Sequence, residues 1–143
     1  MSTRKKKILI VEDDGAVINS IREELKERYH LKTADSYNSA LGIWEEEKPS
    51  FDCIVLDLNI GIQLVKSELI ENYYPLIGLG FLEEVKKFCP DIYQKTIIYS
   101  GYLPQLKIKC VELGLLYDDL NKLSKTPNSI REELIEKIER ICQ

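Results

Sequence analysis

Two separate stretches of the sequence each end a strand-like run with acidic residues. Residues 53–56 are uninterrupted apolar side chains followed by Asp57, and the run 7–11 is followed by Glu12 and Asp13. Carboxylates that lie within a few ångströms of one another repel, and they stay ionised together only beside a cation. A set of oxygen ligands suits a hard ion, and Mg²⁺ is the abundant cytoplasmic choice. The three acids therefore predict a magnesium site, provided that the fold brings the two stretches together.

Other polar residues could complete a site for phosphoryl transfer. A carboxylate beside Mg²⁺, here Asp57, can attack a phosphoryl group and form an acyl phosphate. The ammonium of Lys125 would supply a positive charge for the phosphoryl oxygens. The hydroxyl of Ser100 could donate a hydrogen bond to them, and because that bond exists only when phosphate is present, it could bias a loop between two positions. For Asp57 taken alone, a capping role in a loop is the simpler alternative.

Alternating strand and helix patterns predict how these side chains come together. Strand-like runs and segments of helical spacing alternate along the chain, which is typical of a parallel sheet with helices on both faces. Right-handed crossovers place the carboxyl ends of all strands at one edge, where such folds carry their functional groups. The predicted strands are 7–11, 31–34, 53–56, 96–99 and 120–124, and the predicted helices are 15–29, 37–47, 81–88, 104–113 and 130–141.

Local signals place several helix ends. Asp14 and Ser36 are suitable N-cap residues for the first two helices, because their side-chain oxygens can accept from a free main-chain N–H. Ser129 and Glu132 have the spacing of a capping box before the last helix. Gly114 is the expected stop of the helix over 104–113.

Length and composition limit the class of protein. A chain of 143 residues with no linker or repeat predicts one domain over 1–143, with no effector domain after the last helix. No apolar run is long enough to span a bilayer, and the start of the chain lacks a signal peptide. The four scattered cysteines indicate reduced thiols in a cytoplasmic protein, and the net charge of −4 argues against nucleic acid as the main partner. His30 is the only histidine, so a histidine-based metal site is nearly excluded.

Four motifs, in order, resemble the receiver domain of two-component response regulators, the CheY-like family. They are KILIVEDDG, DCIVLDL, TIIYSG and LSKTP, and the resemblance runs from about residue 6 to 142. It implies a flavodoxin-like, doubly wound, five-stranded parallel sheet of order 2-1-3-4-5. It also implies a phospho-acceptor at Asp57, a switch hydroxyl at Ser100 and the site lysine at Lys125. Mg²⁺ would then be held by Glu12, Asp13, Asp57 and the main-chain carbonyl of Asn59.

The sequence departs from the usual receiver pattern in three places: after the third strand, at the proline that follows the site lysine, and at Lys122, which stands where an aromatic residue is often found three residues before that lysine. Gly61 stands where a proline is usual, and the glycine that normally follows soon after is matched by Gly80. This implies an insertion of roughly 15 residues within 58–78 of the loop after the third strand. Its apolar residues, with helical spacing from Ile62 to Tyr73, suggest an extra helix that acts as a partial lid or partner contact, although a tolerated surface insertion explains it equally well. Thr126 separates Lys125 from the expected proline, which makes Lys122 a rival for the site lysine.

The resemblance implies a stand-alone receiver that accepts a phosphoryl group on Asp57 from a histidine kinase or phosphotransfer protein and then changes its binding to a downstream protein. It implies no enzyme activity, no direct binding of nucleic acid and no membrane contact. The alternative is a receiver-like interaction module that works through fixed contacts without phosphate. A small phosphatase with Asp57 as nucleophile is less favoured, because such enzymes commonly carry a second aspartate two residues later, where Asn59 stands here.

Overall fold

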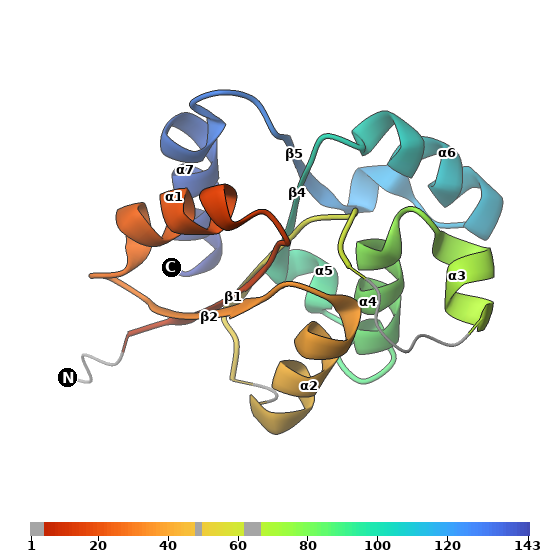
Figure 1. The fold of residues 1–143 in the computed structure, drawn as a ribbon, viewed down its shortest axis with the longest axis horizontal. Coiled ribbons are helices and arrows are strands. Elements are labelled where there is room, and N and C mark those ends of the chain that lie inside the picture. Colours follow the sequence, from red (N-terminus) through yellow and green to blue (C-terminus); the bar gives the residue numbers. More distant parts are fainter. Residues whose placement is uncertain (1–4, 48–49, 62–66) are drawn as a thin grey trace.

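A five-stranded parallel sheet forms the centre of the computed structural model, which describes residues 5–47, 50–61 and 67–143 (Figure 1). The strand order is β2-β1-β3-β4-β5, which confirms the predicted fold class and topology. Both faces of a parallel sheet are covered, so its central strands are continuous apolar runs rather than alternating ones. The strands are β1 (Lys7–Val11), β2 (His30–Ala34), β3 (Cys53–Leu56), β4 (Thr96–Ser100) and β5 (Asn121–Ser124).

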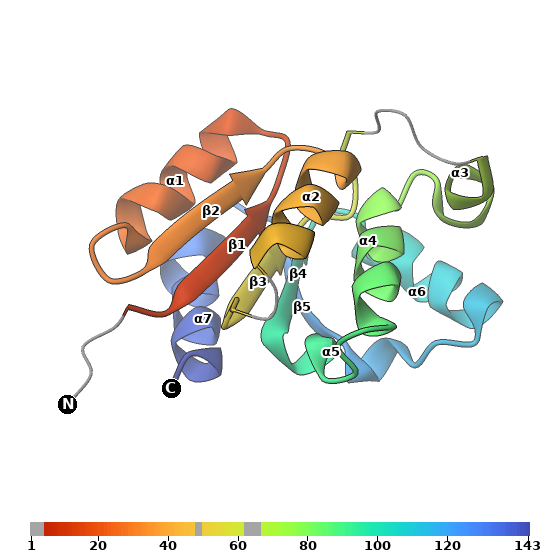
Figure 2. The same cartoon turned by 90° about the horizontal axis from the view of Figure 1, so that it is seen from below.

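Helices cover the two faces of the sheet in two layers (Figure 2). One layer contains α1 (Gly15–Leu25), the π-helical turn η2 (Ile130–Leu134) and α7 (Ile135–Ile141), whose buried residues pack on Ile8, Ile10 and Tyr99. The other layer packs on the alternate residues, including Leu9, Val11 and Ile98. It consists of α2 (Tyr37–Glu47), α4 (Ile77–Lys86), the short α5 (Ile92–Lys95) and α6 (Leu103–Leu113), with α3 (Ser67–Tyr73) against α4 and the 3₁₀ turn η1 (Tyr117–Asp119) against α6.

The alternation along each strand explains this division. Successive side chains of a strand point to opposite faces, so one strand supplies both layers of the core. Ile8, Leu9, Ile10 and Val11 of β1 are all fully buried. Burying one such side chain contributes about 1.5–3 kcal/mol, which is why the apolar runs lie at the centre of the sheet. Cys53, Cys110 and Cys142 are buried free thiols, as expected for core residues.

The predicted helix ends are confirmed at three places and wrong at one. Asp14 Oδ1 accepts from the main-chain N–H of Ala16 at 2.9 Å, and Ser36 Oγ accepts from that of Ser39 at 3.1 Å. Gly114 ends α6 in the left-handed conformation, with φ of 71°, which glycine adopts without strain. Ser129, by contrast, makes no capping hydrogen bond to the following helix, because its hydroxyl is turned back into the preceding loop.

Several predicted boundaries also differ. The first helix ends at Leu25 rather than near 29, and the helix predicted over 81–88 begins earlier, at Ile77. The extra helix expected after β3 is present as α3, Ser67–Tyr73, while residues 62–66 of that prediction lie outside the described residues. Whether this segment is an insertion relative to receiver domains stays a prediction.

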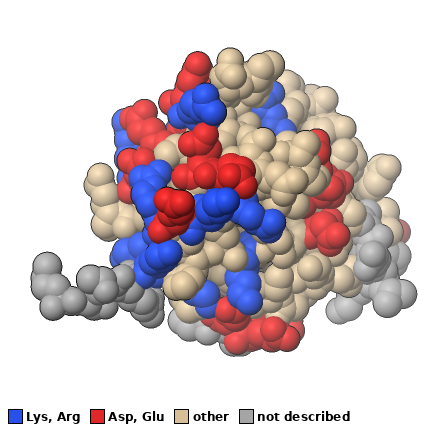
Figure 3. Space-filling view, turned by 60° about the vertical axis from the view of Figure 1, so that its left-hand side comes forward, with Lys and Arg blue, Asp and Glu red and all other residues tan. Residues whose placement is uncertain are grey.

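Charged side chains of both signs are interspersed on the side of the molecule turned forward in Figure 3. Two ion pairs join α1 and the turn after it to the C-terminal helices. Arg28 lies 3.2 Å from Glu139, and Arg131 lies 3.3 Å from Glu24. Exposed pairs of this kind contribute at most about 1 kcal/mol each, so the apolar core carries most of the packing energy. In the part of the chain that the structure describes, none of the helices combines the length and apolar character needed to cross a bilayer.

Candidate functional site

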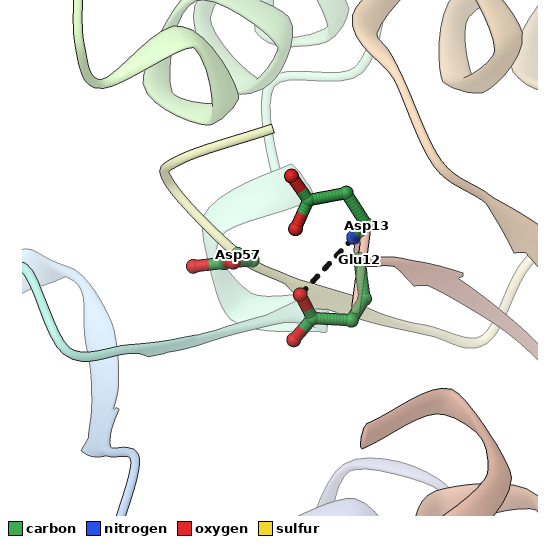
Figure 4. A group of neighbouring side chains, drawn as sticks. All are labelled: Glu12, Asp13 and Asp57. Atoms are coloured by element: carbon green, nitrogen blue, oxygen red, sulfur yellow. Dashed lines mark hydrogen bonds between the residues drawn. The ribbon is translucent and has the colours of Figure 1, made fainter. Parts of the chain in front are cut away.

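Three carboxylates meet at the carboxyl edge of the sheet. Val11, the last residue of β1, pairs with Leu56, the last residue of β3. The residues that follow, Glu12 and Asp57, therefore leave two adjacent strands at the same level. Carboxylate oxygens of Glu12, Asp13 and Asp57 lie within 4.8 Å of one another, and Figure 4 shows them converging from the two strand ends.

The two carboxylates on the sheet are buried, whereas the third faces solvent. Glu12 is 2% exposed and Asp57 6% exposed, and Asp13 is exposed. Glu12 Oε2 accepts from the main-chain N–H of Asp13 at 3.1 Å, and Asp57 Oδ1 accepts from that of Leu58 at 2.8 Å. One oxygen of each buried carboxylate is thus fixed by the backbone, which orients the group within the cluster.

A lysine ammonium contacts two of the three acids. Lys125 follows β5, and its Nζ lies 2.5 Å from Glu12 Oε1 and 3.0 Å from Asp57 Oδ2. Lys122 points elsewhere, since its Nζ donates to the carbonyls of Tyr117 at 2.7 Å and Leu120 at 2.8 Å. Of the two lysines that the sequence left open, the structure therefore brings Lys125, and not Lys122, to the acids.

Burial and ion pairing have opposite effects on the pKa of Glu12 and on the pKa of Lys125. Burial raises the pKa of Glu12 from its usual 4.5 to about 7, a rise that the hydrogen bond from Lys125 limits and the charge of Asp57 increases. Burial alone would lower the pKa of Lys125, but its hydrogen bonds with Glu12 and Asp57 outweigh that effect, so the pKa is raised. Lys125 is therefore a permanent cation that offsets part of the negative charge of the acids.

Ser100 ends β4 at the same edge and is fully buried. Its Oγ accepts from the main-chain N–H of Tyr102 at 3.1 Å, and its main-chain oxygen accepts from the N–H of Lys125 at 3.2 Å. Asn59 turns its side-chain amide to the hydroxyl of Tyr102, at 3.1 Å. The part of the Asn59 carbonyl as a metal ligand stays a prediction.

Gly78 is a site residue that the sequence did not single out. A Cβ on Gly78 would lie 2.1 Å from the main-chain oxygen of Asp57 and 2.9 Å from Leu58 Cα, so only glycine allows α4 to start against the acceptor. The glycine expected in this place was Gly80, whose added Cβ would instead meet the side chains of Leu69 and Tyr73. With two glycines in one short stretch, the sequence carries no signal for which of them makes the close approach.

The donor set fits a hard divalent cation. All three acids offer oxygen, the type of ligand that Mg²⁺ takes, and Mg²⁺ commonly binds one or two protein carboxylates and keeps several waters. The exposed position of Asp13 leaves one side of the cluster open to water. Glu12, Asp13 and Asp57 are therefore able to hold such an ion, and Lys125 is the group with which it would compete.

Comparisons with solved structures show the receiver-domain fold. The non-phosphorylated receiver domain of HemR from Leptospira biflexa has a TM-score of 0.67 and 23% identity, and the match covers 97% of this chain and 95% of that chain. The response regulator protein TrrA from Thermotoga maritima, in complex with Mg²⁺ and BeF, has a TM-score of 0.65 and 22% identity, over 95% of this chain and 98% of that chain.

A sensor protein from Polaromonas sp. is also similar, with a TM-score of 0.70 and 15% identity over 97% of each chain. No protein-family model matches the sequence, and none of the curated proteins matches it. At these identities the likeness shows the fold, and it confirms at that level the resemblance that the four motifs indicated.

Proposed function

We propose that the protein is a response regulator receiver that takes a phosphoryl group on Asp57 in the presence of Mg²⁺ and changes its binding to a downstream protein as a result. One observation carries this proposal. The Asp57 carboxylate follows the central strand β3, with oxygens of Glu12 and Asp13 within 4.8 Å and the Lys125 ammonium 3.0 Å away.

Each residue of the cluster has a part in this reaction. Glu12, Asp13, Asp57 and the Asn59 carbonyl would hold Mg²⁺, which when bound would neutralise charge on the phosphoryl oxygens. A carboxylate oxygen of Asp57 attacks phosphorus, the new O–P bond forms, and the bond from phosphorus to the donor breaks. The electron pair of that bond leaves with the donor, which we infer to be the phosphohistidine of a kinase or phosphotransfer protein. Lys125 keeps its charge and pairs with the phosphoryl oxygens.

Ser100 supplies the report of phosphorylation. Its oxygen accepts the N–H of Tyr102, so its own proton is not used in that bond and can be donated to a phosphoryl oxygen. Tyr102 directly precedes α6, which begins at Leu103. A shift of Ser100 toward the phosphoryl group would move the hydrogen-bonded main chain of Tyr102 and so alter the start of α6. We propose that the downstream protein binds the surface around the start of α6. The protein thus acts as a cytoplasmic switch rather than an enzyme with a diffusible product.

Acetyl phosphate with and without Mg²⁺ tests the proposal. Intact-mass measurement should show one added phosphoryl group with Mg²⁺ and none with EDTA. The Asp57→Asn variant should show none, while Asp52→Asn, at the opposite end of β3, should behave as the wild type. An adduct that persists in Asp57→Asn would contradict the assignment of the acceptor. No adduct, together with no Mg²⁺ binding at millimolar concentration, would favour an interaction module that works without phosphate.

A further inference from the structure

The loop that follows Lys125 is held by one buried hydroxyl. Ser129 is 1% exposed, although Thr126, Pro127 and Asn128 before it are all exposed. Ser129 Oγ donates to the main-chain oxygen of Thr126 at 2.7 Å and accepts from the main-chain N–H of Thr126 at 3.2 Å. The main-chain N–H and carbonyl of Thr126 therefore both bond to the Ser129 hydroxyl, and the carbonyl also accepts from the main-chain N–H of Ser129 at 3.1 Å.

A tyrosine from the sheet completes this arrangement. Tyr99, 3% exposed, places its OH 2.5 Å from Ser129 Oγ. A serine hydroxyl has one proton and two lone pairs. If Ser129 donates to the Thr126 carbonyl, its oxygen can accept from the Thr126 N–H and from the Tyr99 hydroxyl. The three bonds then use the full capacity of Ser129 Oγ, and the buried Tyr99 hydroxyl is satisfied as well.

The outer side of the loop is only partly covered by the rest of the protein. An open hollow of about 350 Å³ lies there, lined by Val17 of α1 together with Tyr99, Lys125, Pro127 and Ile130. Packing against α1 is thus incomplete beside the lysine. On the strand side the main-chain N–H of Lys125 is held by the Ser100 carbonyl at 3.2 Å. Two contacts therefore set the direction in which the Lys125 side chain leaves the backbone. One is the bond from its own N–H to Ser100, and the other is the bonding of the next residue, Thr126, to the Ser129 hydroxyl.

We propose that Ser129 and Tyr99 are positioning residues for Lys125, acting through the Thr126 peptide to keep its ammonium on Glu12 and Asp57. The proposal rests on the proposed function for its kinetic consequence, but the placement of the ammonium is a property of the unphosphorylated protein. Because Tyr99 directly precedes Ser100 in β4, the hydrogen bond between Tyr99 and Ser129 also connects β4 to the loop that follows Lys125.

The variants Ser129→Ala and Tyr99→Phe test this placement. Tyr99→Phe keeps the aromatic ring, whose centroid lies 5.9 Å from Lys125 Nζ, and removes only the hydroxyl. For Ser129→Ala we expect the rate of phosphorylation by acetyl phosphate at saturating Mg²⁺ to fall about fivefold to tenfold, the equivalent of one lost hydrogen bond. Tyr99→Phe should have a smaller effect, and the double variant should be no slower than Ser129→Ala, since the two hydroxyls act as one unit.

A second readout separates positioning from a general loss of structure. The affinity for Mg²⁺ should be unchanged or higher in Ser129→Ala, because a loosened lysine competes less with the metal. The ¹H–¹⁵N signal of the Lys125 ammonium, assigned by its loss in Lys125→Met, should broaden because its hydrogens exchange faster with water. Ser124 is exposed and lies one residue before the lysine, and Tyr29 packs against the same core cluster as Tyr99. Ser124→Ala and Tyr29→Phe should therefore leave rate and signal unchanged.

An unchanged Lys125 signal in Ser129→Ala would overturn the inference. So would a rate and a Mg²⁺ affinity that fall together in proportion to the folded fraction measured by urea unfolding. If the wild-type protein is not phosphorylated at Asp57, the proposed function fails, and the comparison of the Lys125 signal between wild type and Ser129→Ala still decides the positioning role.

Discussion

Replacing Gly78 by alanine should disrupt the acceptor strand end, because helix α4 begins against it. The added Cβ would lie 2.1 Å from the main-chain oxygen of Asp57, more than 1 Å inside normal van der Waals contact, and the atoms that it meets are backbone and cannot rotate away. The hydrogen bond from the Gly78 N–H to the Leu58 carbonyl, at 2.8 Å, would lengthen as the two segments separate.

The size of the effect follows from three contributions. Overpacking of a closed contact costs about 1–3 kcal/mol, and a weakened hydrogen bond adds about 1 kcal/mol. Alanine gains up to about 1 kcal/mol over glycine from its helix propensity, which offsets part of the loss. We therefore expect Gly78→Ala to lower the free energy of unfolding by about 1–3 kcal/mol, and to slow phosphorylation because the Asp57 backbone must move.

Urea unfolding measures the loss of stability in Gly78→Ala, with Gly42→Ala as the matched control. Gly42 lies in α2, and a Cβ there would meet nothing within 4 Å, so its replacement should be neutral or stabilising by up to about 1 kcal/mol. A Gly78→Ala variant that unfolds at the same urea concentration as Gly42→Ala and is phosphorylated at the wild-type rate would refute the close approach.

Two further predictions concern the charges of the cluster. The folded protein holds the Glu12 pKa near 7 instead of 4.5, so between these pH values it binds more protons than the unfolded chain. Without metal, its free energy of unfolding should therefore fall as pH rises through this range, by on the order of 3 kcal/mol at most. Urea unfolding in EDTA should show this slope in the wild type and a flatter profile in Glu12→Gln; equal slopes would contradict the buried carboxyl. Lys125→Met should bind Mg²⁺ more tightly, because the competing cation is gone. It should accept the phosphoryl group more slowly, because the positive charge that pairs with the phosphoryl oxygens is lost. Lys122→Met should change neither the affinity nor the rate. Mg²⁺ titration followed by NMR and the acetyl phosphate assay check both variants, and equal effects of the two would contradict the placement of Lys125.

The sequence predicted the structure correctly where a residue type at a given position has only one structural role open to it. Apolar runs ending in Asp57 and in Glu12 and Asp13 indicated parallel strands whose ends share one edge, and pairing of Val11 with Leu56 brings those acids together. Asp14 and Ser36 cap helices as predicted, since each can reach only its own helix start.

The sequence was misleading where a long-range contact decides between local alternatives. Ser129 has the spacing of a capping residue, but Tyr99, thirty residues earlier, and the Thr126 peptide take its hydroxyl. The sequence alone does not distinguish Gly78 from Gly80, and only the approach of α4 to the Asp57 backbone does so. The choice between Lys122 and Lys125 likewise depended on side-chain direction, since Lys122 is drawn to the carbonyls of Tyr117 and Leu120.

Locating the acyl phosphate is the most direct test of the proposed function. Protein treated with acetyl phosphate and Mg²⁺ can be reduced with borohydride, which converts an acyl phosphate into a stable alcohol, and then digested and sequenced by mass spectrometry. We expect the converted residue to be Asp57 alone, with no conversion in EDTA. Conversion at another carboxylate, or equal conversion with and without Mg²⁺, would contradict the assignment of the acceptor.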